Sequence, residues 1–262
     1  MNVSDSRPAL ALGLLLVISG CAPASPGAGG GDPPLSGPEV TFAAADGLVV
    51  HGTVTDGSGS APRPVVVLSH QLCSNRSEWS ATSHDWVSAF AQRGVTTLAI
   101  DLRGHGRSKL FPDGSTRDLC GGGSAALYAG MVSDVKAAVD YARTTLKAKS
   151  VAVIGASIGS NSSLVAYADD AQLAMVVALS PGLDYLGIKT DGAVGRLGSR
   201  AALLEAADDD SYSADSVRQL QQVNGAITTK IWPTGGHANQ LLAAHPEELT
   251  RVADLVTAKL GM

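Results

Sequence analysis

Short apolar runs rich in valine, leucine and isoleucine alternate along most of the chain with stretches whose apolar residues recur at helical spacing. Most of these runs are continuously apolar, which is typical of strands in a parallel sheet that helices cover on both faces. The alternation of strands with helices predicts a doubly wound α/β fold. The predicted strands are Val65–Ser69, Val95–Ile100, Val151–Ile154, Ala174–Leu179, Ala201–Leu204 and Ala226–Trp232.

Three stretches place apolar residues on one helical stripe, and one further segment predicts a hairpin. The segment Val40–Asp56, with Gly47 at its turn, predicts an antiparallel hairpin at the edge of the sheet. Pro246, followed by two glutamates, is a favourable first turn for the last helix. The stripes are formed by Trp79, Ser83, Trp86, Val87 and Phe90; by Met131, Val132, Val135, Val139 and Ala142; and by Leu249, Val252, Val256 and Leu260.

Residues 1–20 have the pattern of a bacterial export signal. Arg7 precedes the apolar run Ala9–Ile18, which is too short to span a bilayer. The run leads into Ile-Ser-Gly-Cys, ending at Cys21, which resembles the lipobox of bacterial lipoproteins. The resemblance implies cleavage before Cys21 and lipid on its sulfur and amine, which would anchor the protein to the membrane of the cell envelope. Ala22 then favours the outer membrane of a Gram-negative cell, whereas an ordinary signal peptide or a short buried helix is the alternative.

Glycine and proline dominate the segment that follows. Among the 17 residues 22–38, five are glycine and five are proline, a composition that buries too little apolar surface to fold. We therefore expect residues 21–38 to form a lipidated tether. Residues 39–262 are then long enough for one domain with a single core.

The overall composition excludes several classes of function. The 262 residues are 45% hydrophobic and 16% charged, which predicts a packed globular domain. With 19 basic against 24 acidic side chains the net charge is −5, so the basic surface that nucleic-acid binding uses is missing. No histidine pair has zinc-protease spacing, and Asp208–Asp210 lacks the other oxygen ligands of a calcium loop. We therefore expect no nucleic-acid partner, no metal and no cofactor.

Residues Gly155–Gly159 carry the strongest chemical signal. They read Gly-Ala-Ser-Ile-Gly, the G-x-S-x-G pattern, with a predicted strand before them and a helical stretch after them. The two glycines relieve crowding, so that the hydroxyl of Ser157 can project from a strained turn at the start of the helix. A tight turn with a capping serine is the alternative interpretation. We predict that Ser157 is a nucleophile.

A serine hydroxyl needs a base that takes its proton, and histidine has the appropriate pKa. His237 is the preferred base among six histidines, because it lies in a glycine-rich turn after the last predicted strand. A solvent-exposed loop histidine is the alternative. The acid that orients the base is expected in Asp208–Asp210, which follows the preceding strand. Asp210 is favoured because it lies furthest along this turn, and Asp209 remains open as a rival.

The order Ser157, Asp210, His237, together with the Asp101–Ser108 segment after the fourth strand, resembles the α/β-hydrolase family. The likeness covers about residues 40–262 and is nearest to the esterase branch grouped with dienelactone hydrolases. It implies a mostly parallel eight-stranded sheet with helices on both faces. The Ala-Asp-Asp-Asp turn that ends at Asp210 matches the family's acid turn, with alanine in place of glycine. Dienelactone hydrolases proper use a cysteine nucleophile, so the serine here argues against their specific reaction.

The same resemblance implies that the backbone amides of Leu72 and Ile158 form the oxyanion hole. Gln71 stands where the family has a glycine, which puts the geometry of the Leu72 amide in question. If Cys21 carries lipid, Cys73 and Cys120 are an even pair in an oxidising compartment, and we expect a disulfide between them rather than two free thiols. Such a bond would tie the Leu72 loop to the glycine-rich loop 109–124.

The segment Ser180–Arg200 is too short for a packed cap domain, so we expect an open site without one. Tyr128, Asp184 and Tyr185 are candidates for lining it, although a packing role is favoured for each. The sequence thus predicts a serine hydrolase that cleaves small or medium carboxylic esters through an acyl-enzyme on Ser157. The alternatives are an inactive binding lipoprotein of the same fold and an amidase or peptidase with the same triad. The sequence leaves the oligomeric state open.

Overall fold

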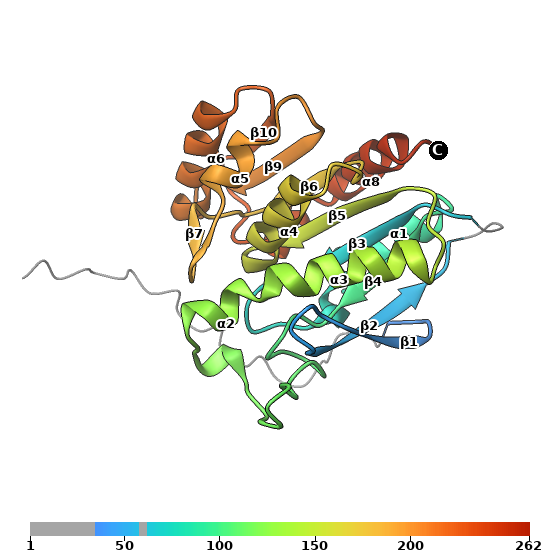
Figure 1. Ribbon diagram of the computed structural model, residues 1–262. Coiled ribbons are helices and arrows are strands. Elements are labelled where there is room, and N and C mark those ends of the chain that lie inside the picture. The colour runs from blue at the N-terminus through green and yellow to red at the C-terminus, as the bar shows by residue number, and fades with distance from the viewer. Residues whose placement is uncertain (1–34, 58–61) are drawn as a thin grey trace, which may run out of the picture. The chain divides into compact units, whose positions relative to one another are not determined.

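The computed structural model describes residues 35–57 and 62–262, which contain an eight-stranded sheet in the order β1-β2-β4-β3-β5-β6-β9-β10 (Figure 1). The six strands from β4 to β10 in this order run parallel, and β2 pairs antiparallel with both β1 and β4. The strands are β1 Glu39–Ala43, β2 Val49–Thr55, β3 Val65–Ser69, β4 Thr96–Ile100, β5 Val151–Ala156, β6 Val176–Leu179, β9 Ala202–Ala207 and β10 Thr228–Trp232. The mostly parallel α/β-hydrolase sheet predicted from the sequence is confirmed.

Helices cover both faces of this sheet because its central strands are apolar on both sides. In β3, Val65 and Val67 pack into one core, whereas Val66 and Leu68 pack into the other, as the alternation of side chains along a strand requires. Helices α3, α4, α5 and α6 contribute to the first core and α1, α7 and α8 to the second. Their bounds are α1 Trp86–Ala91, α3 Met131–Thr144, α4 Ile158–Asp169, α5 Asp191–Gly195, α6 Ser211–Val223, α7 Asn239–Ala244 and α8 Pro246–Lys259.

The apolar stripe between Trp79 and Phe90 does not form one continuous helix. The structure has a 3-10 helix η1, Arg76–Ser80, then a turn, and then the short helix α1. The side chain of Asp85 caps α1 by accepting a hydrogen bond from the Ser88 amide at 2.8 Å, which starts a new helix where the stripe predicts an interior position. Both tryptophans of the stripe are nevertheless fully buried. The periodicity therefore identified the buried face correctly and the length of the helix wrongly.

The segment between β6 and β9 contains no packed cap domain, as predicted. It consists of the two-residue strands β7 (Asp184–Tyr185) and β8 (Ile188–Lys189), which form a small hairpin, and of α5. The remaining elements, η2 (Leu119–Gly121) and α2 (Ala125–Ala129), lie in the long connection between β4 and α3. The carboxyl ends of the parallel strands are thus bordered by loops and short elements.

The predicted export signal, Cys21 and most of the predicted tether lie outside the described residues. The last four tether residues, 35–38, are described, and they lie against β2: Ser36 O accepts a hydrogen bond from Thr55 Oγ1 at 2.5 Å, and Pro38 O accepts one from the Val54 amide at 3.1 Å. Within residues 35–57 and 62–262, no helix has the length and apolar character needed to cross a bilayer.

Candidate active site

Ser157 lies in a sharp turn between β5 and α4, with φ 54° and ψ −119°. A side chain on either flanking glycine would collide with backbone: a Cβ on Gly155 would lie 2.2 Å from Gly159 O, and one on Gly159 would lie 2.3 Å from Ser69 O. The left-handed backbone of a non-glycine residue costs conformational energy that the surrounding structure must offset. The local sequence therefore forces the serine into the strained strand-to-helix turn that G-x-S-x-G predicts.

The loop after β10 brings His237 to Ser157, although 80 residues separate them in the sequence. The His237 Nε2 atom lies 2.8 Å from Ser157 Oγ, and its Nδ1 atom lies 2.7 Å from Asp210 Oδ2. A carboxylate can only accept a hydrogen bond, so the bond to Asp210 places the proton of a neutral imidazole on Nδ1. The lone pair of Nε2 then faces the serine hydroxyl, which is the arrangement that a general base needs.

The environment of Asp210 favours its charged form. Burial alone raises the pKa of this carboxyl, but hydrogen bonds from His237, Ser213 and Ser180 outweigh burial, so the pKa lies below its ordinary value. The Ser180 hydroxyl also accepts a hydrogen bond from the Ala238 amide at 2.8 Å. The carboxylate thus stays ionised beside the imidazole and can stabilise an imidazolium.

The two aspartates beside Asp210 have different contacts. Asp209 accepts hydrogen bonds from the amides of Gly235 and Gly236 at 3.1 and 2.9 Å, and these bonds lower its pKa, that from Gly236 the most. Asp208 pairs with Arg218 at the surface. The N-cap of α6 is Asp210 itself, which makes no side-chain capping bond, and its carboxylate is hydrogen-bonded to His237. Asp210 is therefore the aspartate that pairs with His237, whereas Asp209 binds the backbone of the loop that carries His237.

The backbone around Leu72 is held by His70. The Nε2 atom of His70 accepts a hydrogen bond from the Leu102 amide at 3.0 Å, so Nδ1 carries the proton and donates it to Gln71 O at 2.7 Å. Burial, with a smaller effect of neighbouring His105, lowers the pKa of His70 to about 3, so the ring stays neutral. Because the peptide group is planar and trans, fixing Gln71 O also fixes the opposite direction of the Leu72 N–H.

The Leu72 and Ile158 amides are available as donors. Among residues 35–57 and 62–262, neither amide hydrogen-bonds to a carbonyl or a side chain. Ile158 is the first residue of α4. The amides of the first helical turn have no partner within the helix, and they attract negative charge. These are the properties expected of an oxyanion hole, and Gln71 is accommodated by the bond from His70 without glycine at that position.

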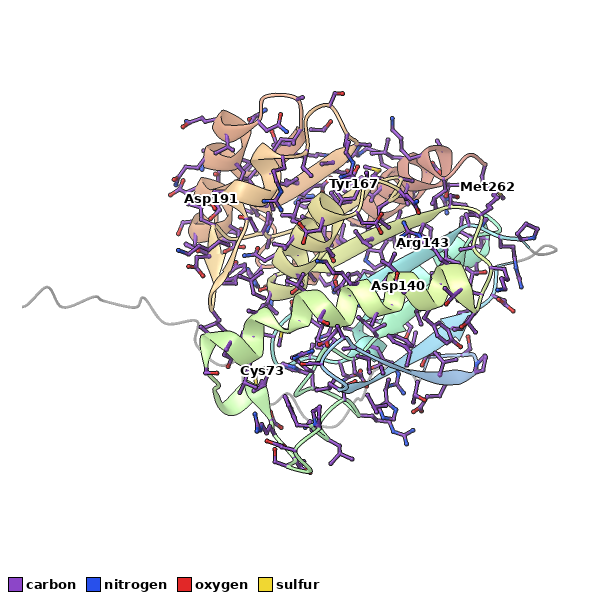
Figure 2. The ribbon with its side chains drawn as sticks, in the orientation of Figure 1. Cys73, Asp140, Arg143, Tyr167, Asp191 and Met262 are labelled. Atoms are coloured by element: carbon purple, nitrogen blue, oxygen red, sulfur yellow. A yellow bond between two sulfur atoms is a disulfide. The ribbon has the colours of Figure 1, made fainter. Side chains whose placement is uncertain are left out.

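A disulfide joins Cys73 and Cys120 beside this loop (Figure 2). Cys73 has φ 62°, so the residue that follows Leu72 is in the left-handed region without being glycine. On the other side, Asp118 Oδ1 accepts a hydrogen bond from the Cys120 amide at 2.9 Å, and Leu119 O accepts one from Tyr128 Oη at 2.8 Å. The bond therefore ties the Leu72 loop to a segment that is itself well anchored.

Of the three candidates for lining the site, Tyr185 lies against the triad. Its ring stands edge-on to the imidazole of His237, with 6.3 Å between ring centroids, and its hydroxyl lies 3.0 Å from Ser213 Oγ. Burial raises the pKa of Tyr185, so it stays protonated. Tyr128 is buried under η2, and Asp184 is exposed and accepts a hydrogen bond from the Gly187 amide. Packing was favoured for all three residues, but Tyr185 also contacts His237 and so borders the site.

Sequence reasoning missed four polar residues that support the triad. Three of them follow strand ends or helix starts, where a polar residue beside an apolar run is a usable signal, although such a signal occurs at many other positions as well. Two of their contacts, Ser180 with Ala238 and Glu78 with Asn239, join segments far apart in the chain, which no local pattern reveals. They are Ser180, Ser213, Asn239 and Glu78, of which the last two are treated below.

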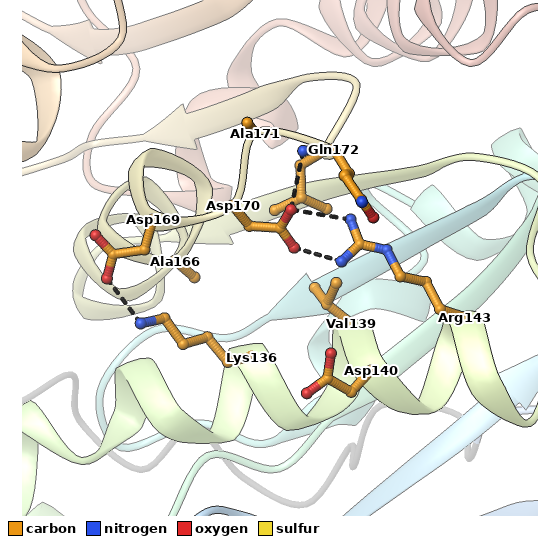
Figure 3. Close-up of a pocket in the computed structure, with 10 residues that line it drawn as sticks. Lys136, Val139, Asp140, Arg143, Ala166, Asp169, Asp170, Ala171 and Gln172 are labelled. Carbon is orange, nitrogen blue, oxygen red and sulfur yellow. Dashed lines mark hydrogen bonds and ion pairs between the residues drawn. The ribbon is translucent and has the colours of Figure 1, made fainter.

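A pocket of about 540 Å³ lies at the opposite end of α4, between α3 and α4 (Figure 3). The cations that line it are paired, Lys136 with Asp169 and Arg143 with Asp170. Since α4 rises about 1.5 Å per residue, its 12 residues place this pocket about 18 Å from Ser157. No group of three or more His, Cys, Asp or Glu side chains in the described parts of the chain could hold a metal ion.

Residues 60–246, more than half of the chain, match the sequence profile of the family described as serine aminopeptidase, S33. A search of curated proteins gives no match.

Among solved structures, the esterase Pf2001 of Pyrococcus furiosus is similar, with a TM-score of 0.67, 19% identity and coverage of 85% of this chain and 92% of the esterase. Est1E of Butyrivibrio proteoclasticus, solved with ferulic acid bound, has a TM-score of 0.64 and 14% identity, covering 83% and 98%. A dienelactone hydrolase of Anabaena variabilis has a TM-score of 0.58 and 18% identity, covering 84% and 96%. At these identities the likeness shows the shared fold.

Proposed function

The chain belongs to the serine aminopeptidase S33 family of α/β-hydrolases and is a hydrolase, and from this premise we propose that it cleaves small or medium carboxylic esters through an acyl-enzyme on Ser157. The observation that carries the proposal is the continuous pair of contacts at His237, 2.8 Å to Ser157 Oγ and 2.7 Å to Asp210 Oδ2. These are the distances at which a base can take the hydroxyl proton and a carboxylate can orient that base.

In the first half of the reaction, Ser157 Oγ attacks the ester carbonyl while its proton passes to Nε2 of His237. Asp210 stabilises the imidazolium that results. The negative charge that develops on the carbonyl oxygen is met by the amides of Leu72 and Ile158, each of which is expected to contribute about 2.7–4 kcal/mol to the transition state. The C–O bond then breaks, and His237 returns the proton to the departing alcohol.

In the second half, water attacks the acyl group on Ser157. His237 takes the proton of that water, and the second tetrahedral intermediate uses the same two amides. When the acyl–oxygen bond to Ser157 breaks, the serine oxygen recovers its proton from the imidazolium. The products are a carboxylic acid and an alcohol, and no cofactor takes part in either half.

Two features support small or medium esters as substrates. The segment between β6 and β9 contains only the β7–β8 hairpin and α5, so it supplies no broad apolar cover for a long acyl chain. The names of similar structures also include an esterase and an enzyme with bound ferulic acid. The family description favours peptide bond cleavage as the second candidate, because the same triad serves both reactions.

We also propose that the protein is exported and held at the cell envelope by lipid on Cys21, as the lipobox-like pattern indicates. The part of the predicted tether before residue 35 would then let the hydrolase domain work at a distance from the membrane. Incorporation of radiolabelled palmitate by the wild type and its loss in Cys21→Ala would support the anchor. Equal labelling of both proteins would refute it.

A fluorophosphonate probe tests the hydrolytic proposal directly, because it reacts with an activated serine. We expect the wild type to be labelled and Ser157→Ala to be unlabelled. Nitrophenyl esters of graded acyl length and aminoacyl nitroanilides, measured on the same preparation, then separate esterase from aminopeptidase activity. Absence of labelling in folded wild type would favour an inactive binding protein, and faster cleavage of nitroanilides would favour a peptidase.

A further inference from the structure

A buried carboxylate lies between two loops of the active site without belonging to the triad. Glu78, on η1, is 7% exposed. Its Oε1 atom accepts one hydrogen bond from the Gln71 amide at 3.1 Å and another from Asn239 Nδ2 at 3.0 Å. One carboxylate oxygen thus links two loops, although Glu78 and Asn239 are 161 residues apart in the sequence. A buried carboxylate is costly unless hydrogen bonds satisfy it, so its donors are held firmly in place.

On one side, this bond fixes the backbone that precedes the Leu72 amide. Glu78 holds the nitrogen of Gln71, and His70 Nδ1 holds its carbonyl oxygen at 2.7 Å. The two bonds leave the Gln71 backbone little freedom to rotate. Since the carbonyl of Gln71 and the N–H of Leu72 belong to the same planar peptide group, the bond to Glu78 helps to determine where the Leu72 donor points.

On the other side, the bond fixes the start of α7, two residues after His237. Asn239 is 4% exposed, and the only residue between it and His237 is Ala238, with φ 55°. The Ala238 amide is itself bonded to Ser180 Oγ at 2.8 Å. The segment is short, and the amides of His237 and Ala238 are both hydrogen-bonded, so a displacement of Asn239 is passed on to the imidazole.

We infer that Glu78 is a positioning residue that sets the distance between the Leu72 amide and His237. The inference rests on the proposed function, because it assigns Glu78 a role in the same reaction. The amide acts on the oxyanion, which exists only in the transition state and the tetrahedral intermediates. Loss of Glu78 therefore lowers kcat and leaves KM nearly unchanged. A displacement of about 1 Å in such a site costs up to about 100-fold in rate.

The test compares Glu78→Ala with Glu78→Gln in the full chain, using nitrophenyl butyrate as the substrate. We expect kcat of Glu78→Ala to fall by about 10- to 100-fold with KM within about threefold of the wild type. The affinity for a trifluoromethyl ketone that forms a tetrahedral adduct should fall with kcat.

Glu78→Gln keeps an oxygen that can accept both bonds, so its kcat should stay within about threefold of the wild type.

A double-mutant cycle with Asn239→Ala identifies the bond through which Glu78 acts. If both residues work through it, Glu78→Ala combined with Asn239→Ala loses little more than the more damaging single change. Glu248→Ala is the matched control, because Glu248 is a buried carboxylate on α8 outside the active site. It should lower the melting temperature and leave kcat per folded molecule unchanged.

Three results would overturn the inference: a kcat of Glu78→Ala within twofold of the wild type per folded molecule, a Glu78→Gln variant as slow as Glu78→Ala, or a double variant whose loss equals the product of the two single losses. These results are distinct from failure of the proposed function. If the wild type neither turns over esters nor reacts with fluorophosphonate, the hydrolytic proposal fails first. An active wild type that is insensitive to Glu78→Ala refutes only the positioning role.

Discussion

At the scale of single residues, the site combines groups that a local pattern identifies with groups that only tertiary contacts identify. Ser157 was predictable because a strand, two crowding-sensitive glycines and a helix surround it in sequence. For the acid, the sequence favoured Asp210 but left Asp209 open, because one residue along a turn changes the direction of a side chain. In the structure, Asp210 faces the imidazole and Asp209 faces the amides of Gly235 and Gly236.

This difference predicts unequal effects of replacing the two aspartates. In Asp210→Asn, the amide group can donate to Nδ1 of His237, so the proton of the imidazole moves to Nε2 and the base is lost. We expect kcat to fall by about 10³- to 10⁴-fold. Asp209→Ala only loosens the loop, and we expect a loss of about tenfold or less. Steady-state kinetics on both variants decides the matter, and a larger loss for Asp209→Ala would contradict the assignment.

At the scale of elements, the sequence predicted the central parallel strands well because buried strands are continuously apolar, whereas the edge hairpin was predicted from its turn at Gly47. The predicted Val65–Ser69 matches β3 at both ends. The Trp79–Phe90 stripe predicted the length of the helix less well. The side chain of Asp85 caps α1 and so starts a new helix within the stripe. Periodicity reports which face is buried, whereas capping bonds decide where a helix starts.

The disulfide should affect both stability and rate, because it links the loop that contains Leu72 to η2. In the double variant Cys73→Ser with Cys120→Ser, we expect the free energy of unfolding to fall by about 2–4 kcal/mol. We also expect kcat to fall while KM changes little, because the Leu72 amide loses one of its restraints. Urea titration and ester kinetics on the same samples measure both. An unchanged kcat in the folded variant would show that the remaining bonds suffice to hold the loop.

A buried carboxyl pair between β9 and α8 predicts a pH dependence of stability. Burial, followed by the neighbouring Glu248 carboxylate, raises the pKa of Glu205 to about 8. Between its ordinary value of 4.5 and about 8, the folded state binds a proton that the unfolded chain has released. The contribution of Glu205 to stability is therefore present below pH 4.5 and is lost as the pH rises towards 8.

Glu205→Gln should remove this dependence, because an amide stays neutral and its oxygen can still accept the hydrogen bond from Arg251. We expect the melting temperature of the variant to fall less than that of the wild type between pH 5 and pH 8. Exposed Glu247→Gln is the control and should follow the wild type. Parallel curves for Glu205→Gln and the wild type would contradict the raised pKa.

At the scale of the whole molecule, the described domain begins before its first strand. Ser36 and Pro38 lie in a segment whose composition predicts a tether, yet their carbonyl oxygens accept hydrogen bonds from β2. Composition could not reveal this, because a backbone carbonyl bonds in the same way whatever side chain its residue carries. Glu39 adds side-chain contacts at this edge, with His51 at 2.9 Å, with Arg76 at 3.1 Å and with Arg107.

These contacts predict where the chain can be shortened. A protein beginning at residue 35 keeps every bond named above, so we expect its melting temperature and kcat/KM to equal those of the full chain. A protein beginning at residue 40 loses Glu39 and both carbonyl bonds, which leaves Arg76 with one carboxylate partner in place of two and shortens β1. We expect this protein to have a lower melting temperature but an unchanged KM. The reason is that β1 is an edge strand, whereas Ser157, Asp210 and His237 follow the strands β5, β9 and β10. Equal melting temperatures for the two shortened proteins would show that the domain boundary lies beyond Glu39.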